Sequence, residues 1–426
     1  MTLIKNLMQT WLPSKDLKRL VLVRGLRSFM QGYILVIFTI YLSQVGFSAW
    51  LIGITLGIGS ATSAILTLIT GVLSDRFGRK PFLLGYGMLL AISGIIFSIT
   101  TVPFILIFVS ALGGIGRSGG AGGQAGPFAP AEIALLSEKT TVTTRPKVFS
   151  VNTVIGTLAM AIGALLAGVP ELLRAMFHLS LLASYQPLFM SIILIGIITV
   201  IVMLPITEIP RKKTSKNIQA SIRRKANFKL IWKISIAGML NGFGLGFIGG
   251  ILPYWLYIRF GVQPSAIGLV IGISSFLTSI SSFWIVSAAR RFGDINVISI
   301  SRLAGVLFTL LLAFAPTYPV AAILIILRMA GAMSAMPIRQ SYTMGIIDAD
   351  LRGTAAGIGG IARRLPSAVS PTISGYWLTV NQLELPFYAG ALFMGINTVL
   401  YFFWFHKVKP VDSKTITEEA DIGNVT

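Results

Sequence analysis

Apolar stretches long enough to cross a membrane recur along almost the whole chain. A helix needs roughly 20 predominantly apolar residues to span the hydrocarbon core of a bilayer. Twelve stretches approach or exceed this length, six in the first half and six in the second. They cover residues 21–42, 47–72, 80–101, 103–127, 148–170, 185–206, 230–258, 264–288, 295–316, 318–341, 353–379 and 386–405. The sequence therefore predicts an all-α polytopic membrane protein with twelve transmembrane helices.

The composition supports this class and excludes several chemistries. Charged residues make up 12% of the chain and hydrophobic residues 54%, whereas a soluble protein is about 25% charged. The chain has no Cys, and its two His, His178 and His406, lie far apart. Disulfides, thiolate metal sites and Cys nucleophiles are excluded, and no zinc motif is present. We expect no enzymatic activity, no catalytic residue, no metal and no cofactor.

The positive charge is distributed as membrane topology predicts. The chain has 35 Lys and Arg against 14 Asp and Glu, a net charge of +21. With the N-terminus inside, only Arg174 and Arg259 fall on the outer side. Cytoplasmic loops are enriched in Lys and Arg, so both termini are expected in the cytoplasm of a multi-pass cell-membrane protein. Since nucleic-acid binding needs a continuous basic face, no nucleic-acid partner is expected, whereas basic loops can contact membrane lipids.

The chain divides into two halves related by an internal repeat. Residues 1–206 form the predicted first six-helix bundle, 207–228 a basic cytoplasmic linker, 229–410 the second bundle and 411–426 a cytoplasmic tail. An offset of 215 residues aligns Arg76-Phe77-Gly78 with Arg291-Phe292-Gly293. Two like-oriented bundles are one known transporter plan, with the substrate site near the midplane between them.

The loop after the second stretch carries the most specific motif. It reads Gly71-Val72-Leu73-Ser74-Asp75-Arg76-Phe77-Gly78-Arg79-Lys80-Pro81. This motif resembles the loop 2-3 signature of the major facilitator superfamily, whose members move small solutes by alternating access. The resemblance implies that Asp75 holds the two halves together on the cytoplasmic side, against a helix N-terminus near Gly353. Gly71, Arg76, Gly78 and Arg79 complete this conformational latch.

Polar residues inside the spans are the candidate binding residues, because ionisable groups in a membrane are costly and mark functional sites. The predicted substrate-binding residues are Arg27, Gln31, Arg117, Asn152, Asn241, Arg328 and Arg339. Four other arginines lie near cytoplasmic helix ends and are expected to snorkel. They are Arg24, Arg302, Arg363 and Arg364.

The balance of buried charge predicts the type of solute. Glu132 is the one acid expected to approach the membrane interior, and guanidinium groups match carboxylates and phosphates. The sequence therefore predicts a monomeric secondary transporter for a small organic anion or polar solute. One alternative is a proton-coupled multidrug efflux antiporter in which Glu132 carries the proton. An alternative of another class is a non-transporting membrane receptor or lipid-handling scaffold on the same fold.

Overall fold

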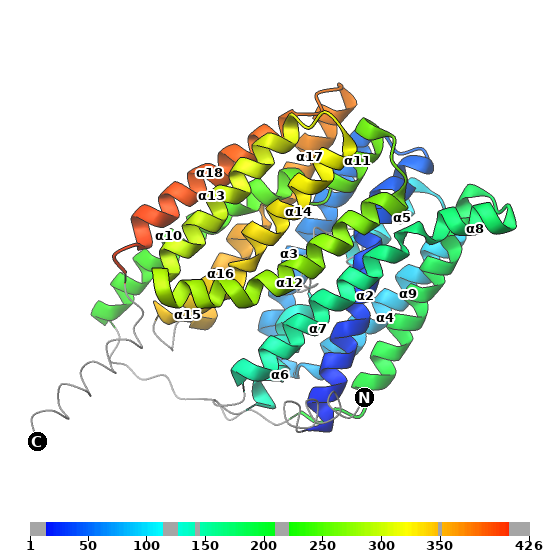
Figure 1. Cartoon of the computed structure of the whole chain (residues 1–426). Helices are drawn as coiled ribbons and strands as arrows, with labels where there is room; N and C mark the ends of the chain where they lie inside the picture. The colour runs from blue at the N-terminus through cyan, green and yellow to red at the C-terminus, as the bar shows by residue number, and fades with distance from the viewer. Residues whose placement is uncertain (1–13, 114–126, 141–144, 209–220, 348–351, 409–426) are drawn as a thin grey trace, which may run out of the picture.

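The structure is a computed structural model, and it describes residues 14–113, 127–140, 145–208, 221–347 and 352–408. Within these ranges every regular element is a helix (Figure 1). The first half contains α2 (Lys15–Gln44), α3 (Ala49–Phe77), α4 (Lys80–Ile99), α5 (Pro103–Gly113), α6 (Phe128–Glu138), α7 (Arg145–Leu165), η2 (Leu166–Gly168), α8 (Val169–Phe177) and α9 (Leu181–Met203). The second half contains α10 (Ser221–Ile248), α11 (Leu252–Phe260), α12 (Pro264–Phe292), α13 (Asp294–Ala313), α14 (Tyr318–Ser334), α15 (Met336–Gly345), α16 (Arg352–Arg364), α17 (Pro366–Thr379) and α18 (Leu385–Phe405).

The helices agree with the predicted spans, although several spans are interrupted. Nine described helical stretches are long and apolar enough to cross a membrane, and α5 and α14 are shorter apolar helices. The predicted spans 230–258, 318–341 and 353–379 are each divided into two helices. A proline lies in the first turn of each second piece, at Pro253, Pro337 and Pro366. Proline suits a first turn but lacks the N–H that would continue the preceding helix.

The internal repeat is visible in the helix boundaries. α3 and α12 each contain 29 residues, and their first residues lie 264 − 49 = 215 positions apart. Each helix ends at a phenylalanine followed by a glycine, and Gly78 and Gly293 have φ values of 92° and 84°. Residues with a Cβ rarely adopt this conformation. The repeated Arg-Phe-Gly triplet therefore specifies the same helix stop in both halves.

The hydrophobic core is continuous between the halves at one end of the molecule and separate at the other. We call the end where α2 begins and α18 finishes the basal end, and the opposite end the distal end. One core cluster joins residues of both halves, such as Ile52 and Trp255, near the distal end. Two further clusters, one around Leu20 and Leu135 and one around Ile298 and Phe405, each belong to one half and lie toward the basal end. The two halves are therefore packed together distally and have separate cores basally.

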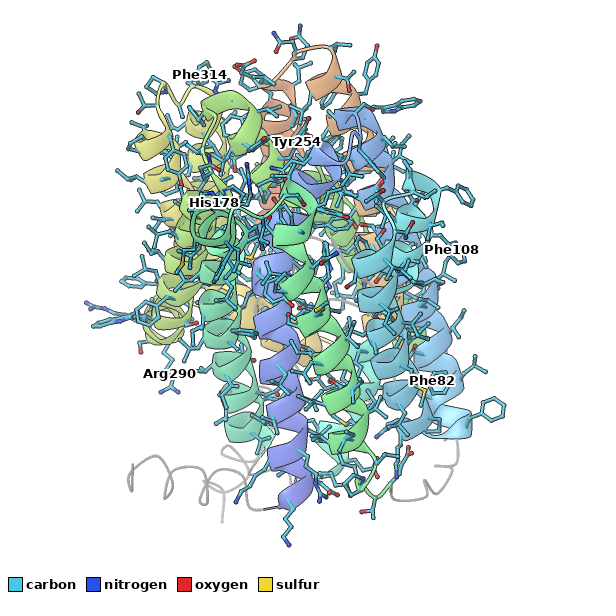
Figure 2. All side chains as sticks on the ribbon, turned by 90° about the vertical axis from the view of Figure 1, so that its right-hand side faces the viewer. Phe82, Phe108, His178, Tyr254, Arg290 and Phe314 are labelled. Carbon is cyan, nitrogen blue, oxygen red and sulfur yellow. The ribbon has the colours of Figure 1, made fainter. Side chains whose placement is uncertain are left out.

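Large apolar side chains cover the outer surface of the helices. Phe82 and Phe108 project outward from the ribbon in Figure 2. Phe104 and Trp284 are 79% and 76% exposed. Such a surface is unfavourable in water but matches the hydrocarbon of a bilayer.

Close backbone packing positions the helices. A Cβ on Gly163 of α7 would lie 1.8 Å from the Phe29 carbonyl oxygen of α2. Two such contacts join the halves. A Cβ on Gly53 of α3 would lie 2.3 Å from the carbonyl oxygen of Pro371 of α17, and a Cβ on Gly268 of α12 would lie 2.2 Å from the carbonyl oxygen of Ala164 of α7. Small residues allow membrane helices to approach this closely.

Candidate functional site

The first half contains a buried ion pair. Arg27 of α2 donates from Nη1 to Oε2 of Glu132 of α6 at 3.4 Å. The two side chains are 12% and 3% exposed. The Arg27 guanidinium carbon also lies 3.7 Å from the centre of the Phe128 ring, one helical turn before Glu132. Glu132 and the ring therefore compensate the buried charge of Arg27.

Two predicted amides lie on the helices that pack around this pair. Gln31 is one helical turn from Arg27 on α2, and Asn152 lies on α7, which packs against α2 through Gly32 and Gly163. Within the described chain, the carbonyl oxygens Gln31 Oε1 and Asn152 Oδ1 are buried and accept no hydrogen bond. Buried polar atoms without partners are uncommon in proteins. Both oxygens are thus available to accept hydrogen bonds from a polar ligand.

The predicted residues of the second half lie on three different helices. Arg328 of α14 is 6% exposed, and its Nε donates to the hydroxyl oxygen of Thr309 at 2.9 Å. Arg339 of α15 interacts electrostatically with Arg302 and Arg363. Asn241 of α10 is buried beside Gly242, where α10 and α16 are in backbone contact.

The structure thus brings Arg27 and Glu132 into contact and places the other predicted residues on helices of their own half. Arg117 lies outside the described residues. The expected snorkelling of Arg24 is wrong, because this residue is 1% exposed and interacts electrostatically with Glu132 inside the first half. The Glu132 carboxylate attracts the guanidinium inward, which the position of Arg24 near a helix end does not reveal.

The motif between α3 and α4 forms a network within the first half. Glu208, which follows α9, accepts hydrogen bonds from the backbone N–H groups of Arg79 and Lys80 at 2.6 and 3.2 Å. It therefore caps the N-terminus of α4. The Arg79 guanidinium pairs with Glu138 at 2.6 Å. Gly78 has a φ of 92°, which favours glycine, and a Cβ there would require the Glu208 carboxylate, 2.8 Å away, to shift.

Three further residues of the predicted latch are Gly71, Asp75 and Arg76. Gly71 lies inside α3, and a Cβ there would meet no atom within 4 Å. The side chains of Asp75 and Arg76 lie outside the described part of the chain, and so do the surroundings of Gly353. The expected latch partner of Asp75 therefore stays a prediction.

Sequence reasoning missed the two acids that hold Arg79. Glu138 and Glu208 both lie on the basic side of the predicted topology. Asp75 is a candidate functional residue because Lys and Arg in cytoplasmic loops set the membrane orientation, and an acid in such a loop does not contribute to it. The same argument, applied to Glu138 and Glu208, would have identified them as partners of the motif.

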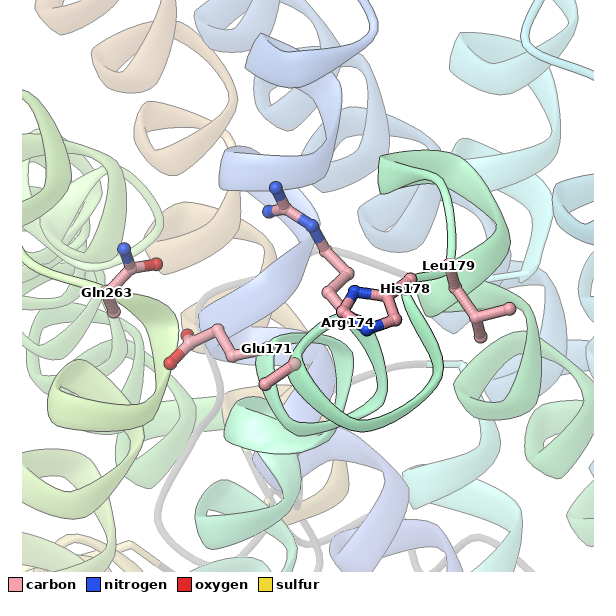
Figure 3. A pocket seen from close by; sticks show the side chains of 6 residues that line it. Glu171, Arg174, His178, Leu179 and Gln263 are labelled. Carbon is pink, nitrogen blue, oxygen red and sulfur yellow. The ribbon is translucent and has the colours of Figure 1, made fainter.

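Polar contacts join the halves at the distal end. Glu171 of α8 accepts hydrogen bonds from the backbone N–H and the hydroxyl of Ser265 at 2.9 and 2.5 Å, at the N-terminus of α12. The backbone N–H of Trp50 in α3 donates to the hydroxyl oxygen of Thr379 in α17 at 3.0 Å. An open pocket of about 620 Å³ lies beside Glu171 (Figure 3). Its lining includes Arg174 and His178, and it contains none of the predicted binding residues.

Comparisons with known proteins agree with this architecture. The family model described as Major Facilitator Superfamily matches residues 20–237 and 234–424. Multidrug resistance protein 1 of Bacillus subtilis is 21% identical, covering 88% of this chain and 92% of that protein. An uncharacterized membrane protein of Saccharomyces cerevisiae is 21% identical, covering 91% and 93%. The crystal structure of the nucleoside transporter NupG superposes with a TM-score of 0.65 at 17% identity, covering 93% of this chain and all of that one. The match over both halves shows that the chain belongs to the major facilitator superfamily and is a secondary transporter that works by alternating access.

Proposed function

We propose that the chain transports a small organic anion, and that its basal end faces the cytoplasm. The observation that carries the proposal is the imbalance of buried charge. Among the described acids, Glu132 alone is fully buried inside the helical bundles. The others lie at or beyond helix ends, and they are Asp16, Glu138, Glu171, Glu208, Asp294 and Glu384. Several arginines lie inside the bundles, which favours a negatively charged solute.

The arrangement of the core supports a conformation open toward the cytoplasm. The halves share one core cluster distally and have separate clusters basally. In such a state a latch on the cytoplasmic side is open, and Arg79 is paired within its own half with Glu138. We infer that Asp75 engages the second half only when the basal ends approach. Asp75→Asn should leave the protein in the membrane and slow transport, whereas an unchanged transport rate would contradict the latch.

Pairs of compounds that differ in charge test the proposed substrate class. The purified protein would be melted in an uncharged detergent with adenosine monophosphate or adenosine, gluconate or glucose, and benzoate or benzyl alcohol. A ligand that binds the folded state raises the melting temperature by mass action. We expect at least one anion to stabilise the protein more than its neutral partner, and to be taken up by proteoliposomes that contain the protein. Equal stabilisation by neutral partners throughout the set would refute an anionic substrate.

The second candidate is proton-coupled efflux of lipophilic compounds. The Bacillus subtilis relative is named a multidrug resistance protein, and Glu132 provides a buried carboxylate in contact with Arg27. Protonation of Glu132 would remove its attraction for Arg27 and could couple a proton to a conformational change. Tetraphenylphosphonium efflux that needs a proton gradient and is lost in Glu132→Gln would favour this function. The Glu384→Gln variant, which changes a distal carboxylate, is the matched control.

In either case we expect a monomer that binds a small solute, contacts membrane lipids and needs no nucleic acid, enzymatic activity or cofactor. The observed net charge of +21 then reflects topology and not a polyanionic partner. Size-exclusion chromatography with light scattering would test the monomer directly.

A further inference from the structure

Three arginines from different helices approach one another inside the second half. This arginine cluster consists of Arg302 of α13, Arg339 of α15 and Arg363 of α16. Arg302 and Arg339 interact electrostatically, and so do Arg339 and Arg363. The Arg302 guanidinium carbon also lies 4.3 Å from the centre of the Tyr401 ring of α18. Four helices thus contribute to one strongly positive region.

The arginine cluster lacks the compensation found in the first half. The ion pairs of the described carboxylates join other residues, and no described carboxylate lies within 4.0 Å of the cluster. Arg302 Nη1 and the hydroxyl of Tyr401 are both buried and have no hydrogen-bond partner in the described chain. Tyr401 is 4% exposed. By contrast, Arg27 in the first half has a carboxylate partner, Glu132, in addition to an aromatic ring.

Such an arrangement is unfavourable unless an anion joins it. Like charges repel, and buried polar donors are expected to have acceptors. A carboxylate or phosphate would supply negative charge and several acceptor oxygens at once. The planar guanidinium fork binds these groups in pairs of hydrogen bonds, and the Tyr401 hydroxyl is a further donor.

We propose that the arginine cluster and Tyr401 form a binding site for an oxyanion, the carboxylate or phosphate group of a solute or of a lipid headgroup. If the oxyanion belongs to a solute, the proposal rests on the proposed function, and the residues that bind the anionic group of the substrate lie in the second half. Ile338 and Tyr401 belong to the core cluster that this half alone contains near the basal end. The site therefore lies on the side where the two halves have separate cores. Arg302 and Arg363 are expected from their sequence positions to snorkel. In this proposal they bind the anion instead.

Titration of the purified protein with inorganic phosphate and with benzoate tests the solute form. Thermal melting in an uncharged detergent gives an apparent Kd for each anion. We expect Arg302→Gln and Arg363→Gln to raise this Kd about tenfold or more, because each removes a charge-assisted hydrogen bond. Arg302→Lys keeps the charge and should lose less. Arg290→Gln removes an exposed positive charge from the same half and should leave the Kd within about twofold.

Tyr401→Phe provides a variant that is expected to fold. It keeps the ring beside Arg302 and removes only the unpartnered hydroxyl. A weaker anion affinity in Tyr401→Phe, with an unchanged melting temperature in the absence of anions, supports the site. Equal affinity in wild type, Arg302→Gln, Arg363→Gln and Tyr401→Phe would overturn it, even if the anions bind and the proposed function stands.

Nanodiscs distinguish a lipid headgroup from a soluble anion. Melting would be compared in phosphatidylcholine alone and in phosphatidylcholine with phosphatidylglycerol. Stabilisation by phosphatidylglycerol alone, lost in Arg302→Gln and retained in Arg290→Gln, supports the site with a lipid as its ligand. If, in addition, charged and neutral solutes stabilise the protein equally, the two results together would refute anion transport. The oxyanion site would still be supported. No stabilisation by phosphate, benzoate or phosphatidylglycerol would overturn the site.

Discussion

Removal of the carboxylate of Glu132 should destabilise the protein measurably. In Glu132→Gln the Arg27 guanidinium keeps its charge and loses its ion-pair partner at 3.4 Å. At an effective dielectric constant of about 20, two unit charges at this distance attract each other by about 5 kcal/mol. Breaking a buried pair by removing one partner costs about 3–5 kcal/mol. We therefore expect a loss of about 4 kcal/mol, reduced somewhat by the remaining contact between Arg27 and Phe128.

The corresponding change in melting temperature is small but measurable. At about 2.1 cal/mol/K per residue, 426 residues give an unfolding entropy of about 0.9 kcal/mol/K. A loss of about 4 kcal/mol then corresponds to about 4 to 5 °C. Thermal unfolding of the purified protein in detergent would measure it. The matched control is Glu384→Gln, because Glu384 forms a 2.5 Å pair with Arg259 and is 38% exposed. That exposed pair should contribute about 1 kcal/mol or less.

A double variant separates the ion pair from unrelated effects. Arg27→Met with Glu132→Gln removes both charges, so it should be more stable than the sum of the two single changes predicts, by about 2–3 kcal/mol. The reasoning is refuted if Glu132→Gln melts like the wild type. Strict additivity of the two single changes would equally show that the pair contributes nothing.

Three further predictions follow from backbone geometry and the distal contacts. Gly78→Ala should lower stability more than Gly293→Ala, by about 1 kcal/mol in melting experiments. Both glycines have positive φ, but only at Gly78 would a Cβ displace the Glu208 carboxylate, which accepts hydrogen bonds from the first N–H groups of α4. Gly163→Ala should cost about 3 kcal/mol or more and reduce the monodisperse fraction in size-exclusion chromatography, because its Cβ would lie 1.8 Å from a carbonyl of α2. Since the chain has no native Cys, Ala49→Cys reports distal opening. Adding Glu171→Ala should speed maleimide labelling of this Cys about fivefold or more, since two hydrogen bonds between the halves are lost.

The sequence predicts the number and order of the long helices because length and hydrophobicity are local properties. The 215-residue repeat also predicts that α3 and α12 end at equivalent positions. Gly78 and Gly293 follow these ends and have similar positive φ values. The interruptions at Pro253 and Pro337 are less evident. A proline in a membrane helix can begin a helix, kink it or be accommodated by neighbours. Which of these occurs depends on tertiary packing.

The candidate site is predicted only in part, because its contacts join distant residues. Arg27 and Glu132 are separated by 105 positions, and nothing local relates them. The expectation that Arg302 and Arg363 snorkel considers depth along one helix and not the direction in which each side chain projects. That direction depends on how α13 and α16 are rotated within the bundle, which is a property of packing. The binding roles of Gln31, Asn152, Asn241, Arg328 and Arg339 stay predictions for the same reason.

The distribution of charge also constrains how the two halves can move. The buried pair of Arg27 and Glu132 lies wholly within the first half, so a relative motion of the halves leaves it intact. Most contacts between the halves are of another kind, namely close backbone packing at Gly53 and Gly268, and the neutral hydrogen bond from the backbone N–H of Trp50 to Thr379. Dispersion contacts and neutral hydrogen bonds can separate without stranding a charge in hydrocarbon. Two described contacts between the halves involve a charged group. Glu171 lies at the distal end beside an open pocket, where water can hydrate its carboxylate when the halves part. The Arg364 guanidinium of α16 donates to the Ser63 carbonyl and the Thr67 hydroxyl of α3, which are neutral acceptors. Among the residues that the structure describes, rocking of the halves therefore requires no buried ion pair to break, which favours a free-energy difference between conformations that a bound solute can shift.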